Sequence, residues 1–356
     1  MINNLPPVNV SNTPPAIFQA QYSQSFQKKA DVSWIKAPFN QIALYVHKKL
    51  GMHILTAQNN PHKLTLQELE RGYQSLVHIG GKPITFETPD GVLLKGMHFI
   101  GKGCKEDSPT LILFNGSGMR FEEYGAQTFS VIRIFTINSW LKLGVNVLTF
   151  NYRGTDTNPG SATRDGLILD AEAAFQYVHD HLKVPEGKII FHGHSLGAGI
   201  ASAVGAKHPS INFCADRPFS SLSQVIKMMF GGGMLGIALS SVLKFGDWEY
   251  DVVENLNQIK GHKWVIYHPN EKVIPKGAQL MEYIHLVNAK IPAIAMKAQQ
   301  FQTKNGLRLE DLSLVKSPTP GQISYALCST HMRKLRGPEE KSAYADQINI
   351  ALGNLK

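Results

Sequence analysis

The chain has 356 residues, of which 43% are hydrophobic and 18% are charged. This balance is typical of a folded globular protein, and it excludes both a wholly disordered chain and one that crosses a membrane many times. Lysine and arginine outnumber aspartate and glutamate by 36 to 27, but no dense basic run is interleaved with aromatic residues, so nucleic-acid binding is not expected.

The cysteines and the first residues bear on the compartment. Cys104, Cys214 and Cys328 are sparse and far apart, so they form neither a disulfide framework nor a metal-ligand cluster. Their usage indicates a reducing environment. Residues 1–15 lack a basic start followed by an apolar run, so no conventional secretory signal is visible. The sequence predicts a cytoplasmic protein, although a signal read by a dedicated export machine would not be recognisable here.

The N-terminal part differs in texture from the remainder. Residues 1–31 are rich in Asn, Pro, Gln and Ser, which favours a poorly ordered arm. Residues 32–81 are interpreted as an accessory helical region, in which Thr65 and Glu68 have the spacing of a capping box that opens a helix. The main domain is expected to occupy residues 82–356.

Strand-like runs follow in regular order. Residues 84–88 and 92–99 flank the turn signal Pro89-Asp90-Gly91 and predict a hairpin. Short apolar runs then alternate with helix-length stretches, a pattern that builds a parallel sheet with helices on both faces. These runs cover residues 110–114, 145–150, 188–191, 264–267 and 323–328. The fold class is therefore α/β.

The clearest chemical signal follows the run at 188–191. There Gly193-His194-Ser195-Leu196-Gly197 leads into a helix that begins with small residues. A turn this tight needs glycine two positions before and two positions after the serine, because backbone approaches backbone at both places. It exposes Ser195 at a helix N-terminus. We interpret Ser195 as a nucleophile, the alternative being a structural serine in a glycine turn.

On these residues the chain resembles the α/β-hydrolase superfamily, and within it the cap-poor ABHD-type serine hydrolases, which include esterases, thioesterases and lipases. The resemblance runs over about residues 82–340, with supporting segments at 113–118, 150–155, 170–175 and 216–222 in the family's order. It implies the α/β-hydrolase fold, a mostly parallel central sheet with helices on both faces. It also implies an acyl-serine intermediate, with no organic cofactor and no metal.

The resemblance also implies a base and an acid for Ser195. A serine is activated by a histidine that a carboxylate orients. Residues 268–275 resemble the family's acid loop, with Glu271 at the position where Asp is commoner, and His331 stands where the family has its catalytic histidine. Asp247 and Asp251 are the reserve acids, and Glu271 as a surface carboxylate is the alternative.

Two backbone N–H groups are expected to form an oxyanion hole. One belongs to Leu196, directly after the nucleophile. The other is assigned to Ser117, in a loop where the family usually has His-Gly and this chain has Asn115-Gly116. Gly116 is a neighbouring donor in the same loop.

An apolar insertion lies between the sixth strand of the family and its acid loop. It spans residues 223–262, and residues 228–243 within it carry no charged side chain. The run is shorter than the roughly 20 residues that span a bilayer. An apolar lid or acyl-pocket wall, a buried helix and a membrane-inserted segment remain alternatives. Residues 276–320 form a further insertion without an assigned role.

The predicted function is hydrolysis of a carboxylic ester or thioester through acyl-Ser195, with a small-molecule or lipid ester as substrate. A serine peptidase uses the same groups, and a non-catalytic interaction protein could keep the same fold. The surplus of basic residues favours peripheral contact with anionic membranes.

Overall fold

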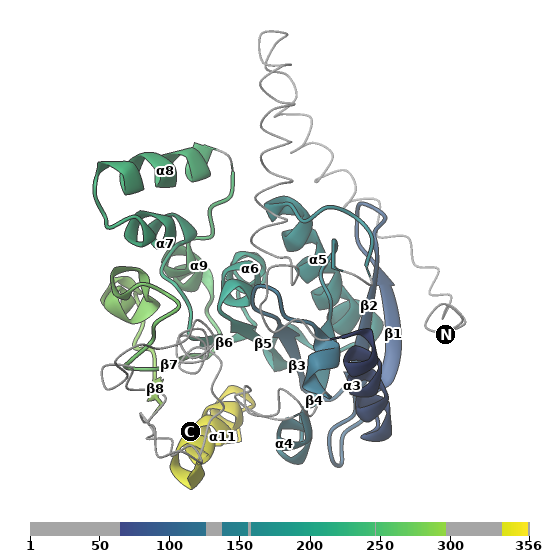
Figure 1. Ribbon diagram of the computed structural model, residues 1–356. Coiled ribbons are helices and arrows are strands. Elements are labelled where there is room, and N and C mark those ends of the chain that lie inside the picture. Colours follow the sequence, from purple (N-terminus) through teal and green to yellow (C-terminus); the bar gives the residue numbers. More distant parts are fainter. Residues whose placement is uncertain (1–64, 126–136, 156–157, 246, 297–336, 355–356) are drawn as a thin grey trace, which may run out of the picture.

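The central feature of the protein is one sheet of eight strands (Figure 1). The computed structural model describes residues 65–125, 137–155, 158–245, 247–296 and 337–354. Within these ranges the strands are β1 Lys82–Glu87, β2 Leu93–Phe99, β3 Thr110–Phe114, β4 Asn146–Phe150, β5 Ile189–His194, β6 Asn212–Asp216, β7 Lys263–Tyr267 and β8 Ala293–Ala295.

The strands are ordered β1-β2-β4-β3-β5-β6-β7-β8 across the sheet. β1 and β2 form the predicted antiparallel hairpin, in which Lys82 pairs with His98 and Glu87 with Leu93. β2 runs antiparallel to β4, and the strands from β4 to β8 are all parallel. Each parallel neighbour needs a crossover connection, which the helices supply. The predicted α/β-hydrolase fold, with its mostly parallel sheet, is confirmed.

The last described strand was not foreseen. β8 lies inside the segment 276–320 that the sequence had marked as an insertion, and it pairs in parallel with β7. It has three residues, of which only Ile294 is buried. So short a run has no readable period. The strand expected at residues 323–328 lies outside the described residues.

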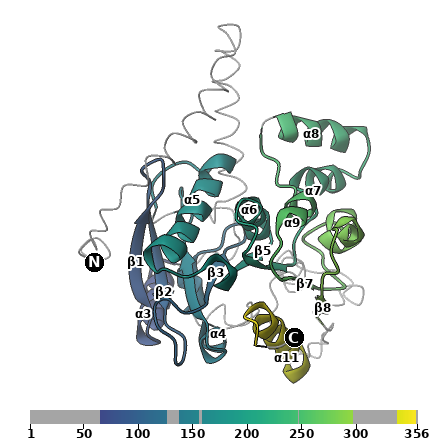
Figure 2. The same cartoon turned by 180° about the vertical axis from the view of Figure 1, so that it is seen from behind.

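Helices cover both faces of the sheet (Figures 1 and 2). One face packs on α5, α6 and α9, and the other packs on α3, α4 and α11. The described α-helices are α3 Leu66–His78, α4 Ile137–Lys142, α5 Arg164–Gln176, α6 Leu196–Gly205, α7 Leu222–Met229, α8 Met234–Phe245, α9 Val252–Gln258 and α11 Gly337–Ala351. Short helical turns add η4 Phe121–Tyr124, η6 Tyr177–His181, η7 Glu186–Lys188, η8 Lys276–Ala278, η9 Leu280–Glu282 and η10 Ile284–Leu286.

The core is therefore divided by the sheet into two apolar layers. Alternate side chains of a strand point to opposite faces. In β3, Ile112 lies in the layer beneath α5 and α6, whereas Leu111 and Leu113 lie in the layer beneath α3 and α11. All five β3 residues are buried, as a strand covered on both faces requires.

Helix α3 joins this core. Its predicted capping box is present: Glu68 N–H donates to Thr65 Oγ1 at 3.2 Å, and Thr65 N–H donates to Glu68 Oε2 at 2.8 Å. Leu76 is buried in the layer that also holds α11. Most of the accessory region 32–81, and the whole arm 1–31, lie outside the described residues. In the described ranges, no helix combines the length and apolar character that a membrane crossing demands.

Candidate active site

Ser195 occupies the junction between β5 and α6 in an unusual backbone conformation. Its φ is 52° and its ψ is −119°, a combination that residues with a Cβ rarely adopt. Such strain costs about 1–3 kcal/mol and persists only where surrounding contacts fix it. Here Ser195 N–H donates to the Asp216 carbonyl at 3.0 Å, and Ser195 O accepts from Ala198 N–H at 3.0 Å. Ser195 is half-buried, whereas the residues on both sides of it are buried.

Two glycines make this tight turn possible. A Cβ on Gly193 would lie 2.4 Å from Ala198 Cα, and one on Gly197 would lie 2.1 Å from the Phe114 carbonyl oxygen. Both distances are well inside van der Waals contact, so no other residue fits without backbone movement. The contact at Gly197 also brings the first turn of α6 directly against the end of β3.

The loop after β3 thus lies beside the start of α6. It forms a turn in which Met119 N–H donates to the Gly116 carbonyl at 3.2 Å and Gly118 has a φ of 69°. Ser117 is exposed at this turn, and Leu196 is the first residue of α6. The N–H groups of a first helical turn have no partner within their helix. The two segments proposed to supply oxyanion donors are therefore adjacent.

Asn115 anchors that loop from below. Its Nδ2 donates to the Phe150 carbonyl at 3.1 Å, and its Oδ1 accepts from the Tyr124 hydroxyl at 2.8 Å. The residue is buried. The amide of Asn115, which stands where the family usually has histidine, ties β3 to β4 through its side chain.

His194 lies against the same loop. A Cβ on Gly116 would meet His194 Nδ1 at 2.7 Å, so the imidazole packs against the glycine backbone. On its other side, His194 Nε2 lies 4.0 Å from Asp216 Oδ2. The ring thus lies between the loop after β3 and the end of β6.

Asp216 is a buried charge to which the sequence pattern assigns no role. It ends β6 and is held by Arg217, whose Nε donates to Oδ1 at 2.8 Å and whose Nη2 donates to Oδ2 at 3.0 Å. Burial alone would raise the pKa of Asp216, but the charges of Arg217 and His194 hold that pKa below its ordinary value. The sequence signal for this buried charge is an acidic residue followed directly by a basic one, Asp216 and Arg217, at the end of the strand that pairs with β5.

A second imidazole connects Asp216 to the C-terminal helix. The Trp140 indole N–H donates to the Tyr344 hydroxyl at 3.0 Å, and that hydroxyl lies 2.8 Å from His192 Nδ1. On the other side of the ring, His192 Nε2 lies 3.8 Å from Asp216 Oδ2.

Glu271 lies in the loop after β7, on the carboxyl edge of the sheet that also holds Ser195. Its Oε1 accepts from the backbone N–H of Val273 at 2.7 Å and from that of Ile274 at 3.3 Å. Both bonds fix the carboxylate relative to its own loop. Of the reserve acids, Asp251 caps α9 by accepting from Glu254 N–H at 3.0 Å. Asp247 is exposed with a φ of 56°.

The predicted base, His331, lies outside the described residues, as does the rest of segment 297–336. The described residues therefore bring together Ser195, Leu196 and the loop that contains Ser117, and they place Glu271 on the same edge. Within the described parts of the chain, no cluster of His, Cys, Asp and Glu is arranged to hold a metal ion.

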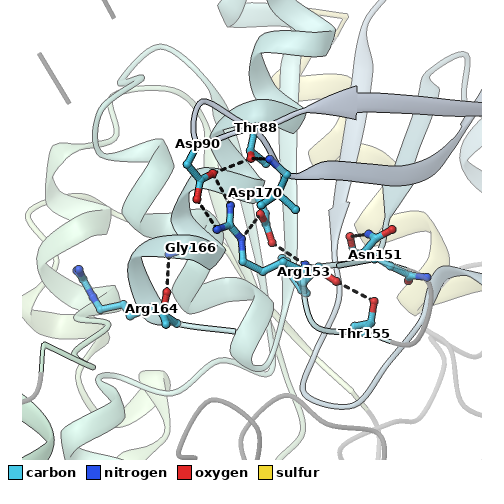
Figure 3. Close-up of polar contacts among 12 residues, drawn as sticks. Thr88, Asp90, Asn151, Arg153, Thr155, Arg164, Gly166 and Asp170 are labelled. Carbon is cyan, nitrogen blue, oxygen red and sulfur yellow. Dashed lines mark hydrogen bonds and ion pairs between the residues drawn. The ribbon is translucent and has the colours of Figure 1, made fainter. Parts of the chain in front are cut away.

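Behind the edge, Arg153 is bound by two carboxylates (Figure 3). Its Nε donates to Asp170 Oδ1 at 2.7 Å, and its Nη1 and Nη2 donate to Asp90 at 2.6 and 2.8 Å. Burial raises the pKa of Asp90, but the hydrogen bonds from Arg153 and Thr88 bring the pKa below its ordinary value. This arginine links the β1–β2 turn to α5, which is a structural role.

Comparison with known proteins identifies a family whose model matches this chain and several relatives. The family described as Chlamydia CHLPS protein (DUF818) matches residues 107–305. The uncharacterized protein Rv2307c of Mycobacterium tuberculosis is 30% identical over 149 residues, which is 41% of this chain and 48% of that protein. The lysophosphatidylserine lipase ABHD12 of Danio rerio is 28% identical over 109 residues, 30% of this chain and 26% of that protein.

The chain thus spans about half the length of the first of these relatives and about a quarter of the second. Among solved structures, an α-β hydrolase from Vibrio vulnificus is similar with a TM-score of 0.54 and 19% identity, covering 71% of this chain and 86% of that one. At that identity the similarity concerns the fold.

Proposed function

Because this chain belongs to the family described as Chlamydia CHLPS protein (DUF818) and has the α/β-hydrolase fold, we propose that it is a serine hydrolase that cleaves carboxylic esters or thioesters. The observation that carries the proposal is the backbone of Ser195, strained at a turn that two glycines alone permit. Strain of this kind gathers at functional sites. A structural serine would gain nothing from it.

The proposed reaction begins with attack of Ser195 Oγ on the acyl carbonyl carbon. The hydroxyl proton passes to His331, and the carbonyl oxygen becomes an oxyanion that the N–H groups of Leu196 and Ser117 stabilise. Collapse breaks the bond to the alkoxide or thiolate, which takes the proton from His331. Water then hydrolyses acyl-Ser195 by the same route. Glu271 is proposed to orient His331 and stabilise its imidazolium form.

A lipid-like acyl group is the proposed substrate class. The insertion after β6 is apolar over residues 228–243 and rises from the edge of the sheet that carries Ser195. The similarity to a protein named a lysophosphatidylserine lipase supports the same class.

Labelling with a fluorophosphonate probe tests the assignment directly. We expect the wild-type protein and the control Ser75→Ala to be labelled once, at Ser195, and Ser195→Ala to remain unlabelled. Ser75 is a half-buried serine on α3, which packs on the face of the sheet opposite α6. Labelling that persists in Ser195→Ala would refute the nucleophile. Absence of labelling and of turnover on every ester and thioester would favour a non-catalytic protein.

A further inference from the structure

The insertion after β6 folds into a two-helix projection that we term the α7–α8 hairpin, residues 222–245. Its helices are joined by a short turn in which Gly231 and Gly232 have φ values of 74° and 73°. In both views of the ribbon, α8 lies outermost, with α7 between it and the body of the protein (Figures 1 and 2).

Helix α8 differs from an ordinary surface helix in which side chains it turns inward and outward. Toward α7 it buries Gly236 and Ser240 together with Leu243. A Cβ on Gly236 would lie 2.4 Å from the Lys227 carbonyl oxygen, so the two helices meet through small residues. A surface helix normally turns its apolar stripe inward. Here two of the three inward residues, Gly236 and Ser240, are small, and the third is Leu243.

The outward side of α8 is apolar instead. Met234 is 89% exposed, Leu235 62%, Ile237 50% and Val242 64%. Exposed apolar side chains continue into the turn at Met229 and Phe230. Scattered single exposures are ordinary, but a contiguous patch marks an interaction surface.

Basic residues beside the apolar run indicate what the patch meets. No charged residue occurs between Lys227 and Lys244, which lie at the two ends of the apolar run. Lys272 and Lys276 are exposed in the adjoining segment, where Gly277 packs on Met228 of α7. Near Lys244 the carboxylate of Glu249 lies 3.8 Å from its ammonium group. The whole chain carries a net charge of +9.

We propose that the α7–α8 hairpin docks the protein on an anionic lipid bilayer. The outer face of α8 enters the boundary between headgroups and acyl chains, and the lysines that flank the apolar run contact the phospholipid phosphates. At 12 residues, α8 extends about 18 Å, which suits a helix lying in the interface rather than across the bilayer.

A bilayer fits this face better than a second copy of the chain. Protein interfaces carry hydrogen bonds across and around their apolar centre. From residue 228 to residue 243, the polar side chains are those of Ser240 and Ser241, and Ser240 is buried toward α7. Lipid tails require no hydrogen bonds from the protein.

Docking would also orient the candidate active site. The end of β6 pairs with the end of β5, with Asp216 opposite His194 in the parallel register. The hairpin begins a few residues after Asp216, so it rises from the edge that carries Ser195. A docked hairpin therefore places that edge close to the membrane surface. The proposal itself does not depend on hydrolysis.

Flotation of the full-length protein with vesicles provides the test. Vesicles of phosphatidylcholine are compared with vesicles that also contain phosphatidylserine, at two ionic strengths. We expect binding to the anionic vesicles that weakens with salt. Leu235→Glu should lower the partition coefficient by at least about tenfold, because it puts a charge where an apolar side chain enters the bilayer. Lys227→Gln with Lys244→Gln should reduce the preference for the anionic vesicles.

Leu66→Glu is the matched control. It makes the same change on α3, at a leucine that is 78% exposed, and should bind as the wild type does. Thermal melting confirms that each variant is folded. The proposal is overturned if no vesicle binds, if Leu66→Glu and Leu235→Glu lose binding equally, or if Leu235→Glu converts a solution dimer to a monomer without vesicle binding. Probe labelling of Ser195 is measured separately, so failure of one proposal leaves the other intact.

Discussion

The turn at Ser195 and the α7–α8 hairpin lie on the same edge of the sheet but are built in opposite ways. At Ser195 an unfavourable backbone conformation is held by two hydrogen bonds and two glycine contacts with neighbouring backbone. In the hairpin, a Cβ on Gly231 or Gly233 would face open space, and the large apolar side chains of α8 face outward. The conformation of the first region is fixed by contacts inside the protein. The second region leaves its large apolar side chains exposed at the surface.

The largest expected effect tests whether the acid loop serves the turn at Ser195. Glu271→Gln should lower the acylation rate by about 10³–10⁴-fold, because an amide cannot stabilise the imidazolium form of the base. Folding should be preserved, since the amide oxygen of Gln can still accept from Val273 and Ile274. The rate is measured by stopped-flow acylation, with Glu282→Gln as a control in the same region.

Unchanged acylation in Glu271→Gln would exclude that residue as the acid. Loss of acylation in Asp247→Asn or Asp251→Asn would then move the role to the segment before β7. Because Asp251 also caps α9, its variant needs a check of stability.

The next effect concerns the buried charge beneath the turn. Asp216→Asn leaves the Arg217 guanidinium without its bidentate partner in a buried site, so it should lower the free energy of unfolding by about 3–5 kcal/mol. The pKa of Asp216 is lowered in the folded protein, chiefly by Arg217 against the effect of burial. Its contribution to stability is therefore present above its unfolded pKa and is lost as pH falls below about 4.

Urea unfolding between pH 7 and pH 3 measures this contribution. The wild type should lose stability on acidification, and the curve for Asp216→Asn should be flatter in that range. Parallel curves for the two proteins would mean that the Asp216 carboxylate does not support the fold. Glu254→Gln, an exposed carboxylate on α9, is the control.

These regions also differ in how far the sequence predicted them. The turn at Ser195 could be predicted from its residue types, because the backbone contacts at Gly193 and Gly197 leave room only for glycine. The strands of the sheet could be predicted from their continuous apolar runs. Asp216 was missed although Arg217, which binds it, follows directly in the sequence, because the two histidines beside it, His192 and His194, lie on the neighbouring strand. The buried-helix alternative for residues 228–243 is wrong, since Met234 and Leu235 are exposed.

The sequence leaves these alternatives open for a physical reason. An apolar run reveals how much hydrophobic surface an element carries, but not which side meets the protein. In α8 the side that meets α7 is set by Gly236, whose missing side chain allows the close approach to Lys227. Composition alone does not predict which side of α8 carries this glycine toward α7.

A pair of alanine substitutions compares the two regions directly. Gly197→Ala introduces a Cβ 2.1 Å from the Phe114 carbonyl oxygen, so it should lower the free energy of unfolding by about 1–3 kcal/mol and reduce probe labelling. Gly231→Ala meets open space and has only its φ of 74° to accommodate, so it should cost about 1 kcal/mol and leave labelling at the wild-type rate. Thermal unfolding and labelling rates are measured on both. Equal losses would contradict the contrast drawn between the two regions.

The smallest expected effect is the gain in binding free energy when one methylene is added to the acyl chain of the substrate. If the apolar residues of the insertion help to bind an acyl chain, each added methylene should favour binding by about 0.8 kcal/mol, or roughly fourfold. Activity on p-nitrophenyl esters should then rise from acetate through butyrate to hexanoate, with Ser195→Ala as the blank. These soluble esters report on the acyl site, whereas the same series carried in anionic vesicles adds the docking step and should lose activity with salt. A flat or falling profile in solution, beside salt-sensitive activity on vesicles, would assign the hairpin to the membrane alone.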